Sequence, residues 1–169
     1  MDTKTASEEF LDLTLKNKGI IIKICNSYCP NKNEREDLAQ EITYQIWKSC
    51  NNFNPDHTFT TWMYRIALNV AISFYRKQRK RGAFVSLSEN ELGIEHTADD
   101  SKELADNIDL LQQFISELKE LDKALMILYL ESKSYSEIAE ILGITETNVT
   151  TRISRAKDAL KQRFVTVQK

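Results

Sequence analysis

The chain has 169 residues, of which 41% are hydrophobic and 28% charged, so it can form a hydrophobic core and is not disordered by composition. Four glycines and two prolines supply too few turns for an all-β sandwich or barrel and favour long helices instead. The net charge of −2, taken alone, argues against nucleic-acid binding. The distribution of the charges along the chain changes that conclusion.

Charge divides the chain into three parts. Residues 65–81 include six bases and no acid, whereas residues 86–109 include eight acids and one lysine. Residues 147–169 are basic again, with six bases against one acid. The acidic segment also shows weak hydrophobic periodicity, which is typical of a linker. We therefore predict an all-α protein of two small helical domains, residues 1–84 and 108–169, joined by an acidic linker at residues 85–107.

The N-terminal part starts with polar and acidic residues and shows no secretory signal. Its isoleucine-rich run at 20–24 predicts a first helix that ends near the Cys29–Pro30 step, because proline cannot continue a helix. The three cysteines, which include Cys25 and Cys50, form no regular framework and indicate free thiols in a reducing compartment. The longest uninterrupted apolar run, at 124–130, is far shorter than the roughly 18 residues that span a bilayer. We expect a soluble, cytoplasmic protein with no membrane insertion.

A second helix is predicted from about residue 34 to residue 49. Leu38, Ile42 and Ile46 recur every four residues, so they can share one buried stripe. Polar residues and one aromatic collect on the other side, namely Asp37, Gln40, Glu41, Tyr44 and Lys48. This face is a candidate docking surface, although an ordinary solvated face has much the same composition.

A third helix, predicted to start between Thr58 and Thr61, combines aromatic and basic residues. A turn-like stretch at 51–56 precedes it. Six aromatics lie between residues 53 and 75, and we expect Phe53, Trp62 and Phe74 to be core, with Phe59, Tyr64 and Tyr75 left open. A polar track follows the same helix through Arg65, Asn69, Ser73, Arg76 and Lys80. Cations pair with phosphates and rings stack on unpaired bases, so this pattern is typical of a surface for melted nucleic acid.

The second domain is predicted to start with a helix or helix pair at about 110–131 and to continue as a helix-turn-helix. Ser134 and Glu137 fit a capping box, and Gly143 can end the short helix that follows. Thr145 can then cap a further helix, whose buried stripe would be Val149, Ile153, Ala156 and Leu160. Its other face presents Thr147, Asn148, Thr151, Arg152, Arg155 and Lys157. Such a helix can enter the major groove of DNA.

Two sets of residues resemble the extracytoplasmic-function (ECF) group of bacterial RNA polymerase sigma factors. Residues 37–41, 59–69 and 75–77 are similar to region 2 of that family. Residues 135–144, followed by Val149, Arg152, 155–157 and Leu160, are similar to region 4. The resemblance implies a subunit without catalytic activity and without a cofactor or metal. It implies binding to core RNA polymerase, at the beta-prime clamp helices and the beta flap, and to promoter DNA. It also implies an anti-sigma factor that holds the protein inactive.

The resemblance further assigns roles to individual residues. For core polymerase they are Asp37, Gln40, Glu41 and Tyr44. For recognition and melting of the minus-ten element they are Asn54, Phe59, Thr60, Trp62, Arg65, Asn69, Arg76, Lys77 and Lys80. For the minus-thirty-five element they are Thr147, Asn148, Thr151, Arg152, Arg155 and Lys157. The chain departs from the family pattern at Ser73, Asp122, Asn148 and Thr150, which leaves the promoter sequence open.

Two other function classes compete with a sigma factor. An ordinary helix-turn-helix repressor or activator would bind duplex operators without polymerase, usually as a dimer. A metal or redox site would use Cys25, Cys29, Cys50, His57 and His96, of which only the first two share a helical spacing. Enzyme hypotheses have less support, because the chain has no Gly-rich phosphate loop and neither histidine lies in a nucleophile motif.

Overall fold

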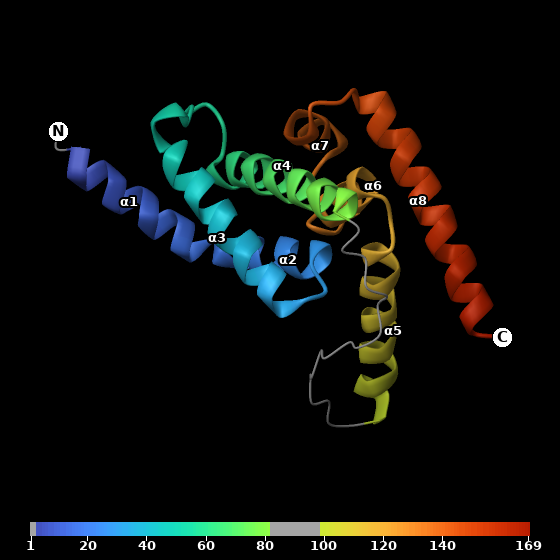
Figure 1. Ribbon diagram of the computed structural model, residues 1–169. Helices are drawn as coiled ribbons and strands as arrows, with labels where there is room; N and C mark the ends of the chain where they lie inside the picture. Colours follow the sequence, from blue (N-terminus) through green and yellow to red (C-terminus); the bar gives the residue numbers. More distant parts are fainter. Residues whose placement is uncertain (1–2, 82–98) are drawn as a thin grey trace.

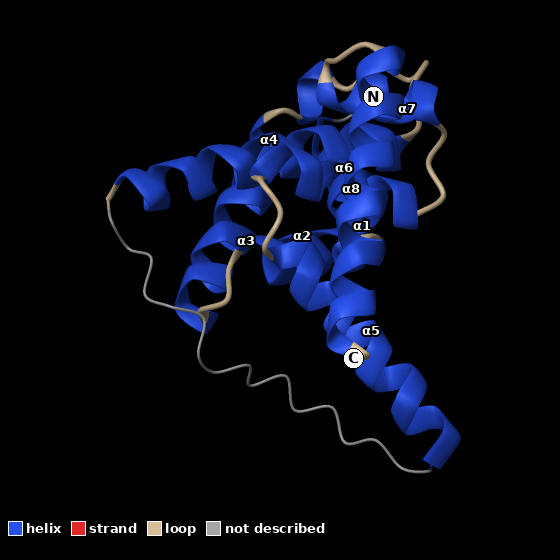
Figure 2. Cartoon of the chain, turned by 90° about the vertical axis from the view of Figure 1, so that its right-hand side faces the viewer, coloured by secondary structure: helices blue, strands red, loops and turns tan. Residues whose placement is uncertain are grey.

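The regular structure of the described residues, 3–81 and 99–169 of a computed structural model, is helical throughout (Figures 1 and 2). An N-terminal group comprises α1 (Thr3–Lys16), α2 (Lys18–Tyr28), α3 (Lys32–Lys48), the 3₁₀ helix η1 (Cys50–Asn52) and α4 (Phe59–Lys80). A C-terminal group comprises α5 (Asp99–Ser116), α6 (Glu120–Leu130), α7 (Tyr135–Leu142) and α8 (Glu146–Val167). The predicted all-α fold with two sets of helices is confirmed. Residues 85–98 of the predicted linker lie outside the described residues, whereas its last part, 99–107, belongs to α5.

The N-terminal group differs from the prediction at its first helix, which is divided into α1 and α2 at Asn17. The side-chain amide of Asn17 donates to the carbonyl of Leu13 at 2.8 Å, and its backbone N–H bonds to the carbonyls of both Leu13 and Thr14. An asparagine that competes in this way for backbone partners favours a helix end. Apolar residues keep a helical period on both sides of Asn17, so the sequence pattern did not predict this break in the helix.

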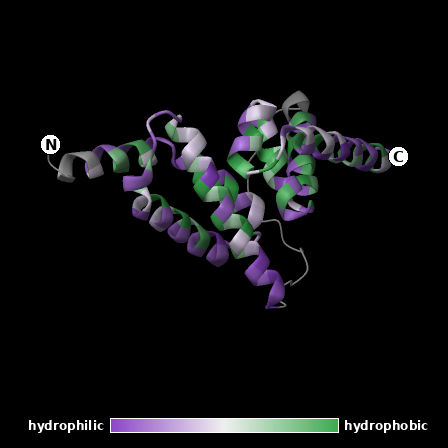
Figure 3. Ribbon diagram, turned by 90° about the horizontal axis from the view of Figure 1, so that it is seen from above, coloured by the Kyte–Doolittle hydropathy of each residue, from purple (hydrophilic) through white to green (hydrophobic). Residues whose placement is uncertain are grey.

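Helices α2, α3 and α4 pack together to form the core of the N-terminal group. The predicted stripe of α3 is buried, since Leu38 and Ile42 are 0% exposed and Ile46 is 1% exposed. It faces Ile24 of α2 and Leu68 of α4 in one hydrophobic cluster. Hydrophobic residues accordingly face inward where helices pack, while hydrophilic residues occupy the outer faces (Figure 3).

The C-terminal group contains the predicted helix-turn-helix, formed by α7 and α8. The capping box is present: the Ser134 hydroxyl accepts from the Glu137 backbone N–H at 3.1 Å, and the Glu137 carboxylate accepts from the Ser134 backbone N–H at 2.8 Å. Gly143 ends α7 in the left-handed conformation, with φ of 66°, which a side chain would strain. Thr145 caps α8 through its side-chain oxygen, and the predicted stripe that starts at Val149 is buried.

The two groups of helices pack against each other, in what we call the closed arrangement. Helix α4 contacts α6 and α7, and α2 contacts α5 and α6, so one hydrophobic cluster runs through both groups. Figure 1 shows α4 in the middle of the molecule, with α7 next to it, α6 at its right-hand end and the two chain termini at opposite sides. Polar contacts add to this interface: Lys23 pairs with Glu131, and the Tyr28 hydroxyl donates to the Glu120 carbonyl at 2.6 Å.

Lys123 of α6 lies at the centre of the interface and is only 1% exposed. Its Nζ atom is 4.8 Å from the ring centroid of Tyr28 and 4.9 Å from that of Tyr75, which are distances typical of cation–π contacts. Burial lowers the pKa of the Lys123 amine to about 8. The amine is therefore mostly charged at neutral pH and depends on the two tyrosine rings of the N-terminal group for its stabilisation.

Candidate nucleic-acid interface

The outer face of α3 presents the four residues predicted to bind polymerase. Asp37, Gln40, Glu41 and Tyr44 are all exposed there, opposite the buried stripe. Glu41 accepts a hydrogen bond from the side-chain amide of Gln45 at 2.8 Å, so its carboxylate is held along the helix. The structure thus brings the predicted docking residues onto one surface.

Trp47, which the sequence pattern does not single out, enlarges this surface. Its side chain is 60% exposed, and its ring centroid lies 6.4 Å from that of Tyr44, which is 50% exposed. The Lys48 amine lies 5.9 Å from the Tyr44 ring. Exposed aromatic side chains of this kind are enriched in protein interfaces. Trp47 follows buried Ile46 by one residue and therefore lies off the buried stripe. This spacing is the sequence signal from which its exposure could have been predicted.

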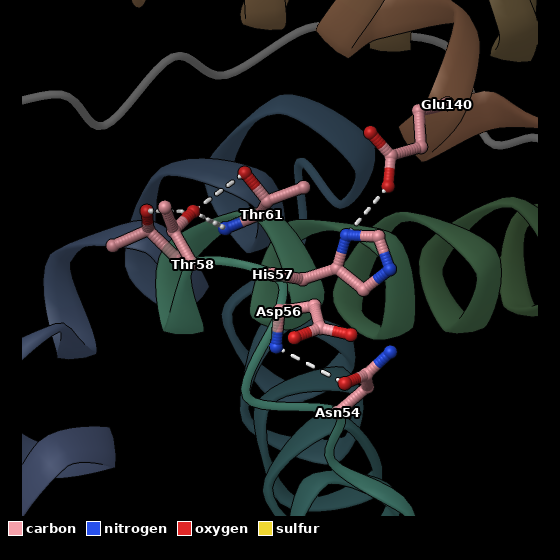
Figure 4. Close-up of polar contacts among 7 residues, drawn as sticks. Asn54, Asp56, His57, Thr58, Thr61 and Glu140 are labelled. Carbon is pink, nitrogen blue, oxygen red and sulfur yellow. Dashed lines mark hydrogen bonds and ion pairs between the residues drawn. The ribbon is translucent and has the colours of Figure 1, made fainter.

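The loop before α4 and the first turn of that helix hold the first four residues predicted for the minus-ten element. The Asn54 side chain accepts from the Asp56 backbone N–H at 3.0 Å, which shapes the loop, and Thr58 caps α4 (Figure 4). Thr60 is half-buried beside this cap. From the same loop His57 reaches across to α7, where its Nδ1 atom lies 2.8 Å from Glu140 (Figure 4).

Phe59 and Trp62 lie in a packed cluster of four aromatic rings. Phe10 of α1 stands edge-on to both of them, with centroid distances of 5.2 Å to Phe59 and 5.1 Å to Trp62. Phe53 completes the cluster at 5.5 Å from Trp62. Both predicted DNA residues are half-buried, so they join α1 to α4 and keep only part of each ring accessible.

The polar track of α4 is exposed along its whole length. Arg65 and Asn69 lie in the middle of the helix, and Lys77 and Lys80 lie near its end. Arg76 is exposed as well, but its Nε atom donates to Glu120 of α6 at 3.1 Å. In the closed arrangement this one predicted DNA contact is therefore engaged by the C-terminal group.

The side of α8 that carries the residues predicted for the minus-thirty-five element is exposed at Thr147, Asn148, Thr151 and Arg155. The other two predicted residues are partly buried. The Lys157 amine lies 4.1 Å from the Tyr129 ring, and a hydrogen bond with the Tyr129 side chain raises the pKa of Lys157. Arg152 donates to Asp122 of α6 at 2.9 Å and to the Asn148 side chain at 3.1 Å, so its guanidinium is held within its own domain.

The alternative hypothesis of a metal site requires several ligands close together. In residues 3–81 and 99–169, no three His, Cys, Asp or Glu side chains gather in a way that could hold a metal ion. Cys25 and Cys29 are buried at the end of α2, and burial raises the pKa of Cys25 to about 11 and that of Cys29 to about 12. Cys50 lies apart in η1, and His96 is outside the described residues. None of the described helices is long and apolar enough to span a bilayer.

Comparisons of the sequence with known families match both halves of the chain. Residues 13–81 match Sigma-70 region 2, and residues 108–160 match Sigma-70, region 4. The ECF RNA polymerase sigma factor SigW of Bacillus subtilis is 30% identical, over 95% of this chain and 91% of that protein. The ECF RNA polymerase sigma-E factor of Escherichia coli is 26% identical, over 88% of this chain and 82% of that protein.

Solved structures agree with the fold. The sigma factor RpoE of Bartonella quintana, solved with the anti-sigma factor NepR, superposes with a TM-score of 0.72 at 21% identity and covers 96% of this chain and 99% of its own. CnrH, solved with the cytosolic domain of CnrY, gives a TM-score of 0.67 at 20% identity, over 96% of this chain and 94% of its own. From the two matched regions and the relatives together, the chain belongs to the ECF group of sigma-70 family RNA polymerase sigma factors, which act in transcription initiation.

Proposed function

We propose that this sigma factor divides its work among three surfaces. The outer face of α3 docks on the beta-prime clamp helices of core RNA polymerase, the N-terminal domain recognises and helps melt the minus-ten element, and α8 recognises the minus-thirty-five element, with the beta flap contacting the C-terminal domain. The observation that supports this proposal is the segregation of charge: an acidic and aromatic face on α3, and two basic faces on α4 and α8.

The α3 surface suits a protein partner better than DNA. Asp37 and Glu41 place negative charge beside the exposed rings of Tyr44 and Trp47, and phosphates would be repelled by these carboxylates. Aromatic rings next to a polar rim supply the buried area on which a stable protein contact depends. This surface lies on a different helix from both basic faces, so polymerase and DNA can be bound at the same time.

The two basic surfaces suit different forms of DNA. Helix α8 starts with a cap and presents Thr147, Asn148 and Arg155 from its first turns, which is the geometry of a helix entering the major groove of a duplex. On α4, Arg65 and the cations near its end can hold phosphates beside the partly accessible rings of Phe59 and Trp62. Partly accessible rings can stack on unpaired bases, which a melted minus-ten element would offer.

An anti-sigma factor belongs to the same proposal. Both structural relatives named above were solved in complexes, one with the anti-sigma factor NepR and the other with CnrY. The closed arrangement already engages Arg76 of the DNA-facing track through Glu120, so a partner that stabilises it would keep the protein inactive. The chemistry of the chain does not identify that partner.

Reciprocal substitutions test the division of labour. Arg155→Ala should weaken promoter binding and lower the slope of log affinity against log salt by about 1, because one phosphate or base contact is lost. It should leave the affinity for core polymerase unchanged. The double substitution of Asp37 and Glu41 by Ala should do the reverse. Fluorescence anisotropy with labelled promoter and co-purification with core polymerase measure the two affinities.

Thermal unfolding of each variant provides the control, since all three residues are exposed and should change stability little. If both sets of substitutions abolished both activities in folded protein, the proposed separation of surfaces would be wrong. If the wild-type protein bound duplex DNA alone but neither core polymerase nor its clamp fragment, its helix-turn-helix would act as in a repressor or activator.

A further inference from the structure

A chain of polar contacts joins α6 to the DNA-facing end of α8. Asp122 of α6 accepts a hydrogen bond from the Arg152 Nη1 atom at 2.9 Å, and the Arg152 Nε atom donates to Asn148 Oδ1 at 3.1 Å. Asp122 and Arg152 are partly shielded, with side chains 25% and 37% exposed, whereas Asn148 is exposed. The contacts therefore run from a partly shielded carboxylate on α6 to the exposed surface of α8, the second helix of the helix-turn-helix.

The chemistry of these groups fixes the orientation of the Asn148 amide. A guanidinium has hydrogen-bond donors only, so the Asn148 atom that faces Arg152 must be the carbonyl oxygen. The amide nitrogen, with its two N–H donors, is then the part of Asn148 left for a ligand. Asp122 supports this orientation because it binds the guanidinium at Nη1, which leaves Nε to donate to Asn148.

The orientation of the amide decides which base edge it can recognise. Adenine is bound by asparagine through two bonds, in which the amide oxygen accepts from N6 and the nitrogen donates to N7. The Asn148 oxygen keeps a second lone pair, but it already accepts from a cationic donor, so a second bond from N6 is weaker and the pair with adenine loses strength. Guanine offers two acceptors, N7 and O6, and thymine offers O4, so both can be bound by the amide N–H groups alone.

We propose that Asp122 is a positioning residue for promoter recognition: through Arg152 it turns Asn148 so that this side chain donates to a guanine or thymine edge in the upstream promoter element and discriminates against adenine. The inference rests on the proposed function of α8 and adds to it the base edge that one residue recognises. Two neighbouring hydroxyl groups do not supply the same donor. Thr150 and Thr151 already donate their hydroxyl hydrogens to the carbonyls of Glu146 and Thr147, each at 3.0 Å.

A second ion pair of α8 provides a matched control. Arg163, near the other end of the helix, pairs with Glu117, the residue directly after α5. Glu117→Ala and Asp122→Ala each remove one carboxylate that ties α8 to another part of the C-terminal group, but only Asp122 connects to Asn148. A purely structural role of Asp122 would make the two variants alike, whereas a positioning role would separate them.

The test uses holoenzyme assembled from the full chain and core polymerase, and promoter fragments with each of the four base pairs at every position of the upstream element. Competition binding with Asn148→Ala identifies the base pair whose preference depends on Asn148, and wild type should prefer guanine or thymine there over adenine. In the Asp122→Ala variant, the ratio of the affinity for the preferred base to the affinity for adenine should fall about fivefold at the same base pair. Asp122→Asn should retain it, because its amide oxygen still accepts from Arg152, and Glu117→Ala should retain it as well.

The proposal is overturned if wild type prefers adenine at that pair, if Asn148→Ala changes no position, or if Asp122→Ala weakens all sequences equally. These results would leave upstream recognition by α8 intact. Failure of the proposed function is distinguishable, because wild-type holoenzyme would then show no sequence preference anywhere in the upstream element.

Discussion

Replacing Lys123 by Glu should separate the two groups of helices in the free protein. The Lys123 amine lies between the faces of Tyr28 and Tyr75 and is 1% exposed, so a carboxylate there would meet two electron-rich rings and the nearby charge of Glu120. An unpaired buried charge costs about 3–5 kcal/mol, which is comparable with what holds a small interface together. Small-angle X-ray scattering should show a larger radius of gyration than for wild type.

Lys123→Met is the matched control, because it keeps an unbranched apolar stem and removes the charge. It should remain closed, and an unchanged radius of gyration for Lys123→Glu would contradict the interpretation.

Closure lowers the pKa of Lys123 from 10.5 to about 8, so the penalty for burying the charged amine is complete below pH 8 and is lost as the pH rises toward 10.5. Wild type should therefore gain closure relative to Lys123→Met over that range. The facing groups Tyr28, Cys29, Tyr75 and Glu120 are the same in both proteins.

Trp62→Ala should lower the free energy of unfolding by about 3–5 kcal/mol. Trp62 joins α1 to α4 through its contacts with Phe10 and Phe53, and removing the indole leaves a cavity between helices that are far apart in sequence. Denaturant unfolding, followed by circular dichroism, measures the loss. Trp62→Phe should cost less, because a ring still fills most of the space.

The other tryptophan supplies the comparison for this experiment. Trp47 is 60% exposed on α3, so Trp47→Ala should change stability by no more than about 0.5 kcal/mol. It should instead weaken the binding of core polymerase. Equal destabilisation by the two alanine substitutions would show that the aromatic cluster around Trp62 does not hold α1 in place.

Local features of the fold were predictable because the signals that form them are close together in the sequence. Ser134 and Glu137 make the capping box that their spacing indicates, and Gly143 takes the positive φ that ends α7. The stripe that contains Leu38 and Ile42 is buried as its period of four predicts. Each of these features depends on residues within one or two helical turns, so neighbouring residues suffice to identify them.

Features that depend on packing between distant segments were not predictable in the same way. The burial of Lys123 requires rings from α2 and α4, and the engagement of Arg76 requires Glu120 of α6. Asp122 was visible in the sequence only as a departure from the family pattern, and its partner Arg152 lies 30 residues further along the chain. The start of α5 inside the predicted linker was hidden because acidic residues are also favourable in the first turn of a helix.

The different exposure of Cys29 and Cys50 makes it possible to measure how often the two groups of helices separate. Cys29 is 2% exposed and lies close enough to Lys123 for the two groups to shift each other's pKa, whereas Cys50 is only half-buried in η1. A thiol reagent should therefore modify Cys50 first, and Cys29 only when α6 moves away and its thiol reaches water. The ratio of the two labelling rates reports how often the native sequence opens, without any substitution.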